Sequence, residues 1–164
     1  MKSLHIVRHA KSLWNDKGVA DIDRPLKPKG VRSAYDVARK LKLDHLTPDR
    51  IITSPADRAL HTAIIFARIF EYPLESIEIR NLLYESSAEK IIHFIGKTDD
   101  KYNSLMIFGH NPEFTDLANF YTGNNHISLP TSGVVSLKFN VNAWKDLHGS
   151  HLTAHKLSFP DKDL

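Results

Sequence analysis

The stretch that decides the fold runs from residue 4 to residue 15 and reads LHIVRHAKSLWN. Its apolar start contains the β-branched pair Ile6 and Val7, which predicts a buried strand. The strand ends at Arg8 and His9, and a polar loop follows. In parallel sheets, ligands bind at the carboxyl ends of the strands, because the loops there lead to helix N-termini with free N–H groups. Arg8 and His9 therefore stand where a guanidinium binds phosphate and an imidazole acts as a nucleophile.

A second apolar strand is predicted at residues 50–53, and it leads directly into a helix. Ser54 fits the N-cap of that helix and Pro55 fits its first position. This places Arg58 in the first turn or just beyond it. A cation is disfavoured at the positive end of a helix dipole, so an anion bound beside Arg58 explains it better than a surface charge.

Another apolar strand is predicted at residues 104–108, and it also leads into a helix. A glycine follows it and permits a tight turn, Asn111 fits a helix N-cap, and Pro112 fits the first helical position. His110 is thereby placed at a strand end beside a helix N-terminus. A further strand is predicted at residues 76–80, and Glu85 comes shortly after it, before a helix capped by Ser86 or Ser87.

The remaining pattern completes an α/β fold. Apolar residues at three- and four-residue spacing predict an amphipathic helix over residues 31–43. Two strand-like stretches at residues 134–139 and 152–157 predict an antiparallel pair at one edge of the sheet. We expect a three-layer sandwich, with a mostly parallel central sheet flanked by helices and an antiparallel edge near the C-terminus. A parallel sheet brings the predicted strand ends, and so Arg8, His9, Arg58, Glu85 and His110, to one edge.

Composition limits the class of protein. The 164 residues fit one domain, residues 1–164, that buries about 70% of its unfolded surface. The chain has no cysteine, and no signal peptide or membrane-spanning apolar run is recognisable, so we expect a cytoplasmic protein without membrane contact. Lysine and arginine exceed aspartate and glutamate by 22 to 19, but they are scattered, so we expect no nucleic-acid partner.

The sequence also bears on cofactors and metals. There is no glycine-rich loop of the nucleotide-triphosphate type, and no cofactor is expected. His148, His151 and His155 are spaced unevenly and lack cysteine or clustered carboxylate partners, so no metal site is predicted there. The paired arginines already supply the positive charge that phosphoryl transfer needs.

Residues 8–15, RHAKSLWN, resemble the N-terminal signature of the histidine phosphatase (phosphoglycerate-mutase-like) superfamily, Arg-His-Gly-Glu-Ser-x-x-Asn. Ala10 and Lys11 replace Gly and Glu, and both make the chain similar to the short phosphohistidine phosphatases of the SixA type. The Arg-Pro-Leu-x-x-x-Gly pattern at residues 24–30 also resembles that branch. Ser54, Arg58 and Thr62 are in register with the family's Ser-x-x-x-Arg-x-x-x-Thr segment, and Gly-His at residues 109–110 is similar to the segment carrying its second catalytic histidine.

The resemblance implies roles for these residues. His9 would attack phosphorus to give a phosphohistidine, and Arg8, Arg58 and His110 would bind the phosphate and stabilise its charge. Asn15 would add a neutral donor to the phosphate. Glu85 only loosely matches the context of the general acid in mutase-like relatives, so it is either that acid or a solvated residue at a helix start.

The resemblance also implies a function. We expect a metal-independent phosphatase acting on protein phosphohistidine. A phosphatase of small phosphoesters and a non-catalytic module that binds phosphorylated partners are the alternatives. The partner is accordingly a phosphorylated protein or a small phosphorylated substrate, and the sequence gives no expectation for the oligomeric state.

Overall fold

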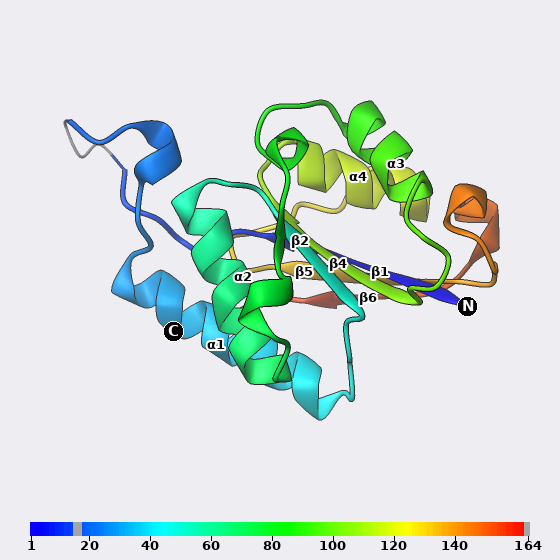
Figure 1. Ribbon diagram of the computed structural model, residues 1–164, viewed down its shortest axis with the longest axis horizontal. Coiled ribbons are helices and arrows are strands. Elements are labelled where there is room, and N and C mark those ends of the chain that lie inside the picture. The colour runs from blue at the N-terminus through cyan, green and yellow to red at the C-terminus, as the bar shows by residue number, and fades with distance from the viewer. Residues whose placement is uncertain (15–17, 163–164) are drawn as a thin grey trace.

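The computed structural model describes residues 1–14 and 18–162, and its centre is a six-stranded sheet (Figure 1). The strand order is β3-β2-β4-β1-β5-β6. The strands are β1 (Lys2–Arg8), β2 (Arg50–Thr53), β3 (Glu78–Ile79), β4 (Ser104–Gly109), β5 (Val134–Phe139) and β6 (Leu152–Ser158). The first four pair in parallel, whereas β5 is antiparallel to β1 and β6 is antiparallel to β5. The predicted mostly parallel sheet with an antiparallel edge is confirmed.

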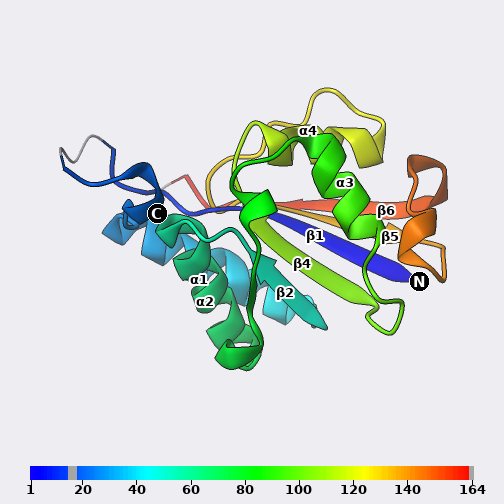
Figure 2. The same ribbon diagram turned by 45° about the horizontal axis from the view of Figure 1, so that its top comes forward.

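Two helices cover each face of the sheet (Figures 1 and 2). The pair α1 (Pro28–Leu43) and α2 (Asp57–Phe70) packs on one face, and the pair α3 (Ala88–Gly96) and α4 (Glu113–Thr122) packs on the other. Side chains of β1 alternate between the two cores: Ile6 is buried against α3 and α4, and Val7 against α1 and α2. Full burial of such a side chain stabilises the fold by about 1.5–3 kcal/mol.

The helix predicted at residues 31–43 is α1, which begins three residues earlier, at Pro28. Its predicted apolar positions are all buried: Ala34, Val37, Ala38 and Leu41. The N-cap of α3 is Ser87, one of the two predicted residues, and its side chain accepts a hydrogen bond from the Lys90 N–H at 3.2 Å. In the part of the chain that the structure describes, no helix has the length and apolar content to cross a membrane.

The predicted starts of α2 and α4 are wrong. α2 begins at Asp57 with Ala56 as its cap, so Ser54 is not an N-cap and Pro55 is not helical. The Ser54 hydroxyl instead contacts His110 and accepts a hydrogen bond from the Ala56 N–H at 3.2 Å. A tertiary partner thus replaces the local cap.

At α4 the helix begins at Glu113 and the cap is Pro112, not Asn111. The Asn111 side chain nevertheless accepts hydrogen bonds from the N–H and hydroxyl of Thr115, at 3.1 and 3.0 Å. Its amide donates to the Leu129 carbonyl at 3.0 Å, which ties this helix start to the loop before β5.

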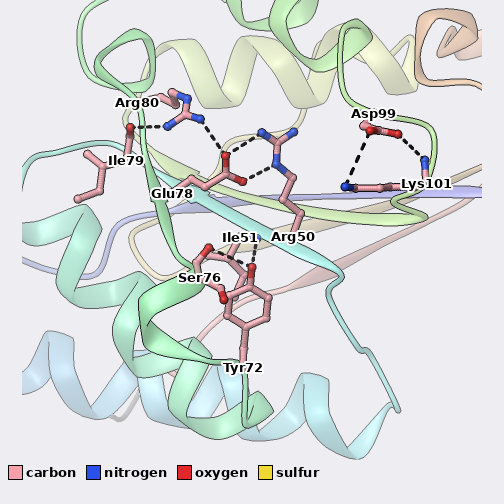
Figure 3. Close-up of polar contacts among 9 residues, drawn as sticks. All are labelled: Arg50, Ile51, Tyr72, Ser76, Glu78, Ile79, Arg80, Asp99 and Lys101. Carbon is pink, nitrogen blue, oxygen red and sulfur yellow. Dashed lines mark hydrogen bonds and ion pairs between the residues drawn. The ribbon is translucent and has the colours of Figure 1, made fainter.

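The edge strand β3 is shorter than predicted, because only Glu78–Ile79 of residues 76–80 pair with β2. Glu78 of this strand also forms ion pairs with Arg50 of β2 and with Arg80 (Figure 3). Glu78 accepts hydrogen bonds from Arg50 at 2.5 and 2.9 Å and from Arg80 at 2.8 Å. The Arg50 guanidinium is the main cause that lowers the pKa of Glu78.

The register of β1 and β4 sets the position of the site. Arg8 lies opposite Gly109 in this parallel pair, so His9 and His110 follow at the same sheet edge. The His9 N–H donates to the Gly109 carbonyl at 3.1 Å, and the His9 carbonyl accepts from the Ser132 N–H at 3.1 Å. The backbone of His9 is therefore fixed from both sides.

Candidate active site

The imidazole of His9 is held by its own backbone neighbour. Nδ1 lies 2.7 Å from the carbonyl oxygen of Ala10, and a carbonyl only accepts, so Nδ1 carries the hydrogen. The lone pair of a neutral ring is then on Nε2. Burial is the main cause that lowers the pKa of His9 to about 4, and the charges of Arg58 and Arg8 act in the same direction. His9 is therefore neutral at pH 7 and has an available nitrogen nucleophile.

A second histidine lies beside the first. The ring centroids of His9 and His110 are 5.2 Å apart. Nε2 of His110 is 2.8 Å from the Ser54 hydroxyl, which orients the ring, while Nδ1 is buried without a hydrogen-bond partner in the described part of the chain. Burial lowers the pKa of His110 to about 3, followed by the influence of His9 and Arg58.

Two arginines reach the site from different elements. Arg8, the last residue of β1, donates from Nη1 to the Leu129 carbonyl at 3.0 Å. Arg58, in the first turn of α2, donates from Nη1 to the backbone carbonyl of Asp21 at 2.7 Å. Both Nε atoms are buried and have no partner among the described residues. Burial lowers the pKa of Arg8.

These observations describe an anion site. Buried N–H groups are nearly always paired in folded proteins, and each unpaired one calls for an explanation. Here three buried nitrogens lack a partner in the described chain, namely Arg8 Nε, Arg58 Nε and His110 Nδ1, and Nδ1 is a donor when the Ser54 hydroxyl donates to Nε2 of the same ring. Guanidinium groups bind phosphate through paired hydrogen bonds, so the arrangement suits a phosphoryl group placed against Nε2 of His9.

Thr62 connects His9 to the helix that carries Arg58. Its hydroxyl donates to the Arg58 carbonyl at 2.6 Å and accepts from the Ala10 N–H at 2.9 Å. Ala10 is thus fixed on one side by Thr62, while its carbonyl holds the His9 ring on the other. Thr62 had a place in the sequence motif, but this connection was not predicted.

Sequence reasoning missed two polar residues at the mouth of the site, Asp21 and Tyr84. The Asp21 carboxylate accepts from the Tyr84 hydroxyl at 2.6 Å and from Arg58 Nη2 at 3.1 Å. The ring of Tyr84 also forms a T-shaped pair with that of His110, with centroids 5.4 Å apart. No periodic or motif signal marks either residue, because they lie in a loop and in a turn 63 positions apart.

The sequence from residue 4 to residue 91 matches the model of the histidine phosphatase superfamily (branch 1). This match covers more than half of the chain and includes His9 and Arg58. The chain belongs to the histidine phosphatase superfamily. The resemblance drawn from residues 8–15 is confirmed.

Proteins with sequences similar to this superfamily member include an uncharacterized protein and a mutase. An uncharacterized protein of Mycobacterium tuberculosis is 34% identical over 116 residues, covering 68% of this chain and 67% of that protein. A 2,3-bisphosphoglycerate-dependent phosphoglycerate mutase of Chlamydia pneumoniae is 26% identical over 66% of this chain and 46% of its own length.

Solved structures place this superfamily member beside the SixA type. A protein of Agrobacterium tumefaciens assigned as the phosphohistidine phosphatase SixA matches with a TM-score of 0.78 and 26% identity, over 84% of this chain and 92% of its own. The protein histidine phosphatase SixA complexed with tungstate has the same fold, with a TM-score of 0.80 and 20% identity over 96% of this chain and 97% of its own. The similarity to the SixA type is confirmed.

The structure brings together some of the predicted site residues of this histidine phosphatase superfamily member, but not all of them. Arg8, His9, Arg58 and His110 are brought together at one sheet edge. Glu85 is exposed, and its neighbour Tyr84 makes the contacts with the site. Asn15 lies outside the described residues.

The rest of the described chain offers two further facts about possible sites. No three His, Cys, Asp or Glu side chains within residues 1–14 and 18–162 gather as ligands of a metal ion would. A groove of about 400 Å³ lies at the opposite, amino end of β1, where it is lined by His5, Ser104, Ser136 and Lys138 among others. The groove is separate from the paired histidines.

Proposed function

We propose that the protein is a metal-independent phosphatase that forms a phosphohistidine at His9 and removes phosphate from protein phosphohistidine. The observation that carries this proposal is the hydrogen bond from His9 Nδ1 to the Ala10 carbonyl. It leaves Nε2 as the nucleophile beside the unpaired donors of Arg8, Arg58 and His110.

The reaction has two steps. In the first, the Nε2 lone pair of His9 forms a bond to phosphorus, and the bond to the leaving group breaks with its electron pair on that group. In the second, water attacks the same phosphorus, and the electron pair of the phosphorus–nitrogen bond returns to Nε2. The protons of the water stay with the phosphate and the solvent. Preorganised donors such as Arg8 and Arg58 stabilise the charge on the equatorial oxygens in both steps.

The substrate class is supported by similarity and by the chemistry of the leaving group. The solved SixA phosphatases have the same fold as this chain, and the nitrogen of a phosphorylated imidazole leaves without the strong acid that an ester oxygen needs. Glu85, the acid suggested by the family comparison, is exposed.

A phosphatase of small phosphoesters is the second candidate. The mycobacterial glucosyl-3-phosphoglycerate phosphatase shares the fold, with a TM-score of 0.68 at 11% identity. The same phosphate site would serve such a substrate, with Glu85 or a substrate group supplying the proton. A module that binds phosphorylated partners without turnover would need the arginines but not a neutral nucleophile at His9.

The test is phosphate release from a phosphohistidine-bearing carrier protein, compared with release from a small phosphoester. We expect release from the carrier to resist a chelator and to disappear in His9→Ala, and we expect a phosphoenzyme that is labile to acid in wild type only. His93→Ala, which removes an exposed histidine of α3, is the matched control and should keep full activity. Full activity of His9→Ala would contradict the proposal, and release from the small phosphoester alone would select the second candidate.

A further inference from the structure

We infer that Asp21 determines specificity in this site: its carboxylate favours a leaving group that departs as a neutral imidazole and disfavours a leaving group that carries negative charge beside the phosphoryl group. The inference rests on the proposed phosphatase function and assigns a role to a residue that lies outside the family motifs described above.

Asp21 lies at the boundary between the phosphate-binding arginine and solvent. Its side chain is 56% exposed, whereas that of Arg58 is 7% exposed. Both the backbone carbonyl and the carboxylate of Asp21 accept from Arg58, at 2.7 and 3.1 Å. The other carboxylate oxygen is 3.1 Å from Arg24 Nε. A phosphoryl group bound by Arg58 is therefore also close to this carboxylate.

The charge of Asp21 also acts on His110. Burial is the main cause that lowers the pKa of His110, and the negative charge of Asp21 acts in the opposite direction. Tyr84 connects the two, because its hydroxyl donates to Asp21 and its ring edge contacts His110. Asp21 is thus close enough to act on groups beside the bound phosphate.

Asp21 acts through charge rather than as a proton donor. The hydrogen bond from Tyr84 is the main cause that lowers its pKa, and the hydrogen bond from Arg58 adds to the effect. A carboxyl held ionised by such donors cannot protonate a leaving oxygen at neutral pH. An alkoxide leaving group would receive no help from it.

A phosphorylated imidazole fits these constraints. When His9 attacks, the phosphorus–nitrogen bond breaks with its electron pair on the departing ring nitrogen. A ring protonated on its other nitrogen then leaves as neutral imidazole, and no further proton is needed. The Asp21 carboxylate stabilises the positive charge of the protonated ring before departure and accepts a hydrogen bond from its N–H.

A substrate with a second anionic group meets the opposite effect. In 3-phosphoglycerate, for example, a carboxylate lies a few bonds from the phosphate and would approach Asp21. Two like charges about 6 Å apart weaken binding by about threefold at the dielectric constant of water and by about 100-fold at the lower effective value near a protein surface, so we expect about tenfold for a half-exposed carboxylate. Removal of the Asp21 charge should relieve this repulsion.

The test compares Asp21→Asn with wild type on two small substrates, phosphoimidazole and 3-phosphoglycerate. We expect kcat/KM for phosphoimidazole to fall by about tenfold and kcat/KM for 3-phosphoglycerate to rise by several-fold. The inference is judged by the ratio of the two kcat/KM values rather than by either value alone. A purely structural role of Asp21 in holding Arg58 would lower both values together, and that outcome or an unchanged ratio would overturn the inference.

Two variants serve as controls. Asp23→Asn makes the same change at an exposed carboxylate in the same turn, Asp21–Asp23, and should leave the ratio within twofold of wild type. Tyr84→Phe removes the hydrogen bond to Asp21 but keeps the carboxylate charge, so the preference for phosphoimidazole should persist.

Failure of the proposed function would be distinguishable from failure of this inference. If wild type releases no phosphate from the phosphohistidine-bearing carrier or from either small substrate, the proposed function fails, and the role of Asp21 is measured by binding in a His9→Ala background. There Asp21→Asn should increase the affinity for 3-phosphoglycerate more than the affinity for inorganic phosphate. Equal changes for the two ligands would overturn the inference.

Discussion

His9 donates its Nδ1 hydrogen to the carbonyl oxygen of Ala10 at 2.7 Å, so a bond between adjacent residues selects the tautomer of the proposed nucleophile. Burial keeps this ring neutral and lowers its pKa to about 4. In an NMR titration of labelled histidine, we expect His9 to remain neutral at pH 5.5, with the hydrogen on Nδ1. Arg58→Ala removes a charge that lowers this pKa, so His9 should then titrate at higher pH. A wild-type His9 that titrates near 6.5 would contradict the assignment.

Thr62→Val should impair both stability and turnover. The change leaves the buried Ala10 N–H without its 2.9 Å partner, which costs about 1–3 kcal/mol of unfolding free energy. It also releases Ala10 from α2 and shifts the His9 ring, for which we expect an activity loss of about 10- to 100-fold. Thr98→Val is the matched control, because the Thr98 hydroxyl is buried without a partner in the described chain. If both variants behave alike in denaturation and kinetics, Thr62 has no special role.

Ser54→Ala should reduce turnover and cost about 1–3 kcal/mol of unfolding free energy, because the buried hydroxyl also accepts from the Ala56 N–H at 3.2 Å. Its hydroxyl is 2.8 Å from His110 Nε2, and without it the ring loses the contact that orients Nδ1 toward the phosphate. We expect kcat to fall by about 10- to 100-fold, since a misplaced donor weakens stabilisation of the transition state. Ser136→Ala removes a comparable serine–histidine contact, to His5 at 2.9 Å in the distant groove, and should keep wild-type kcat. Equal kcat values for the two variants would argue against this role of Ser54.

Gly30→Ala tests how closely α1 approaches the loop after His9. A Cβ at Gly30 would lie 2.2 Å from the carbonyl oxygen of Lys11, so α1 or the loop must shift. We expect a loss of more than about 1 kcal/mol in unfolding free energy, with reduced activity. At Gly96, near the end of α3, a Cβ meets nothing closer than 3.9 Å, and Gly96→Ala should be neutral or slightly stabilising. Urea denaturation measures the unfolding free energy of both variants, and equal values would contradict the prediction.

The sequence pattern predicts the sheet and the reactive pair better than it predicts their surroundings. Arg8, His9 and His110 follow continuous apolar strands, and parallel pairing brings such strand ends together whatever the intervening loops do. The helix starts at Ser54 and Asn111 were predicted wrongly because local capping rules ignore competing tertiary partners, here His110 and Leu129.

The contacts of Asp21 at the mouth of the site could not be predicted from the sequence, for a related reason. Asp21 meets Arg58 across 37 positions and Tyr84 across 63, and neither pairing leaves a periodic signal. Asp21 is in a short 3-10 turn, Asp21–Asp23, within a polar loop, where an acidic side chain is usually read as solvated. Only the fold shows that this carboxylate contacts Arg58, an arginine of the proposed phosphate site.

His5 should make stability depend on pH. It is 5% exposed, with Nδ1 2.9 Å from the Ser136 hydroxyl and Nε2 3.2 Å from the Ser104 hydroxyl. Burial is the main cause that lowers its pKa from 6.5 to about 4, and the charge of Lys138 adds to this effect. Between those values the unfolded chain binds the proton more readily, so the stability is fully present above pH 6.5 and is lost as the pH falls toward 4.

The measurement is urea denaturation of wild type and His5→Gln at pH 7 and pH 5. The contribution of His5 should make wild type lose about 2 kcal/mol more than His5→Gln between these pH values. His9 and His110 shift in the same direction and remain in both proteins, so the difference between the two isolates His5. The same pH dependence in both proteins would mean that His5 already becomes protonated in the folded state near its usual pKa.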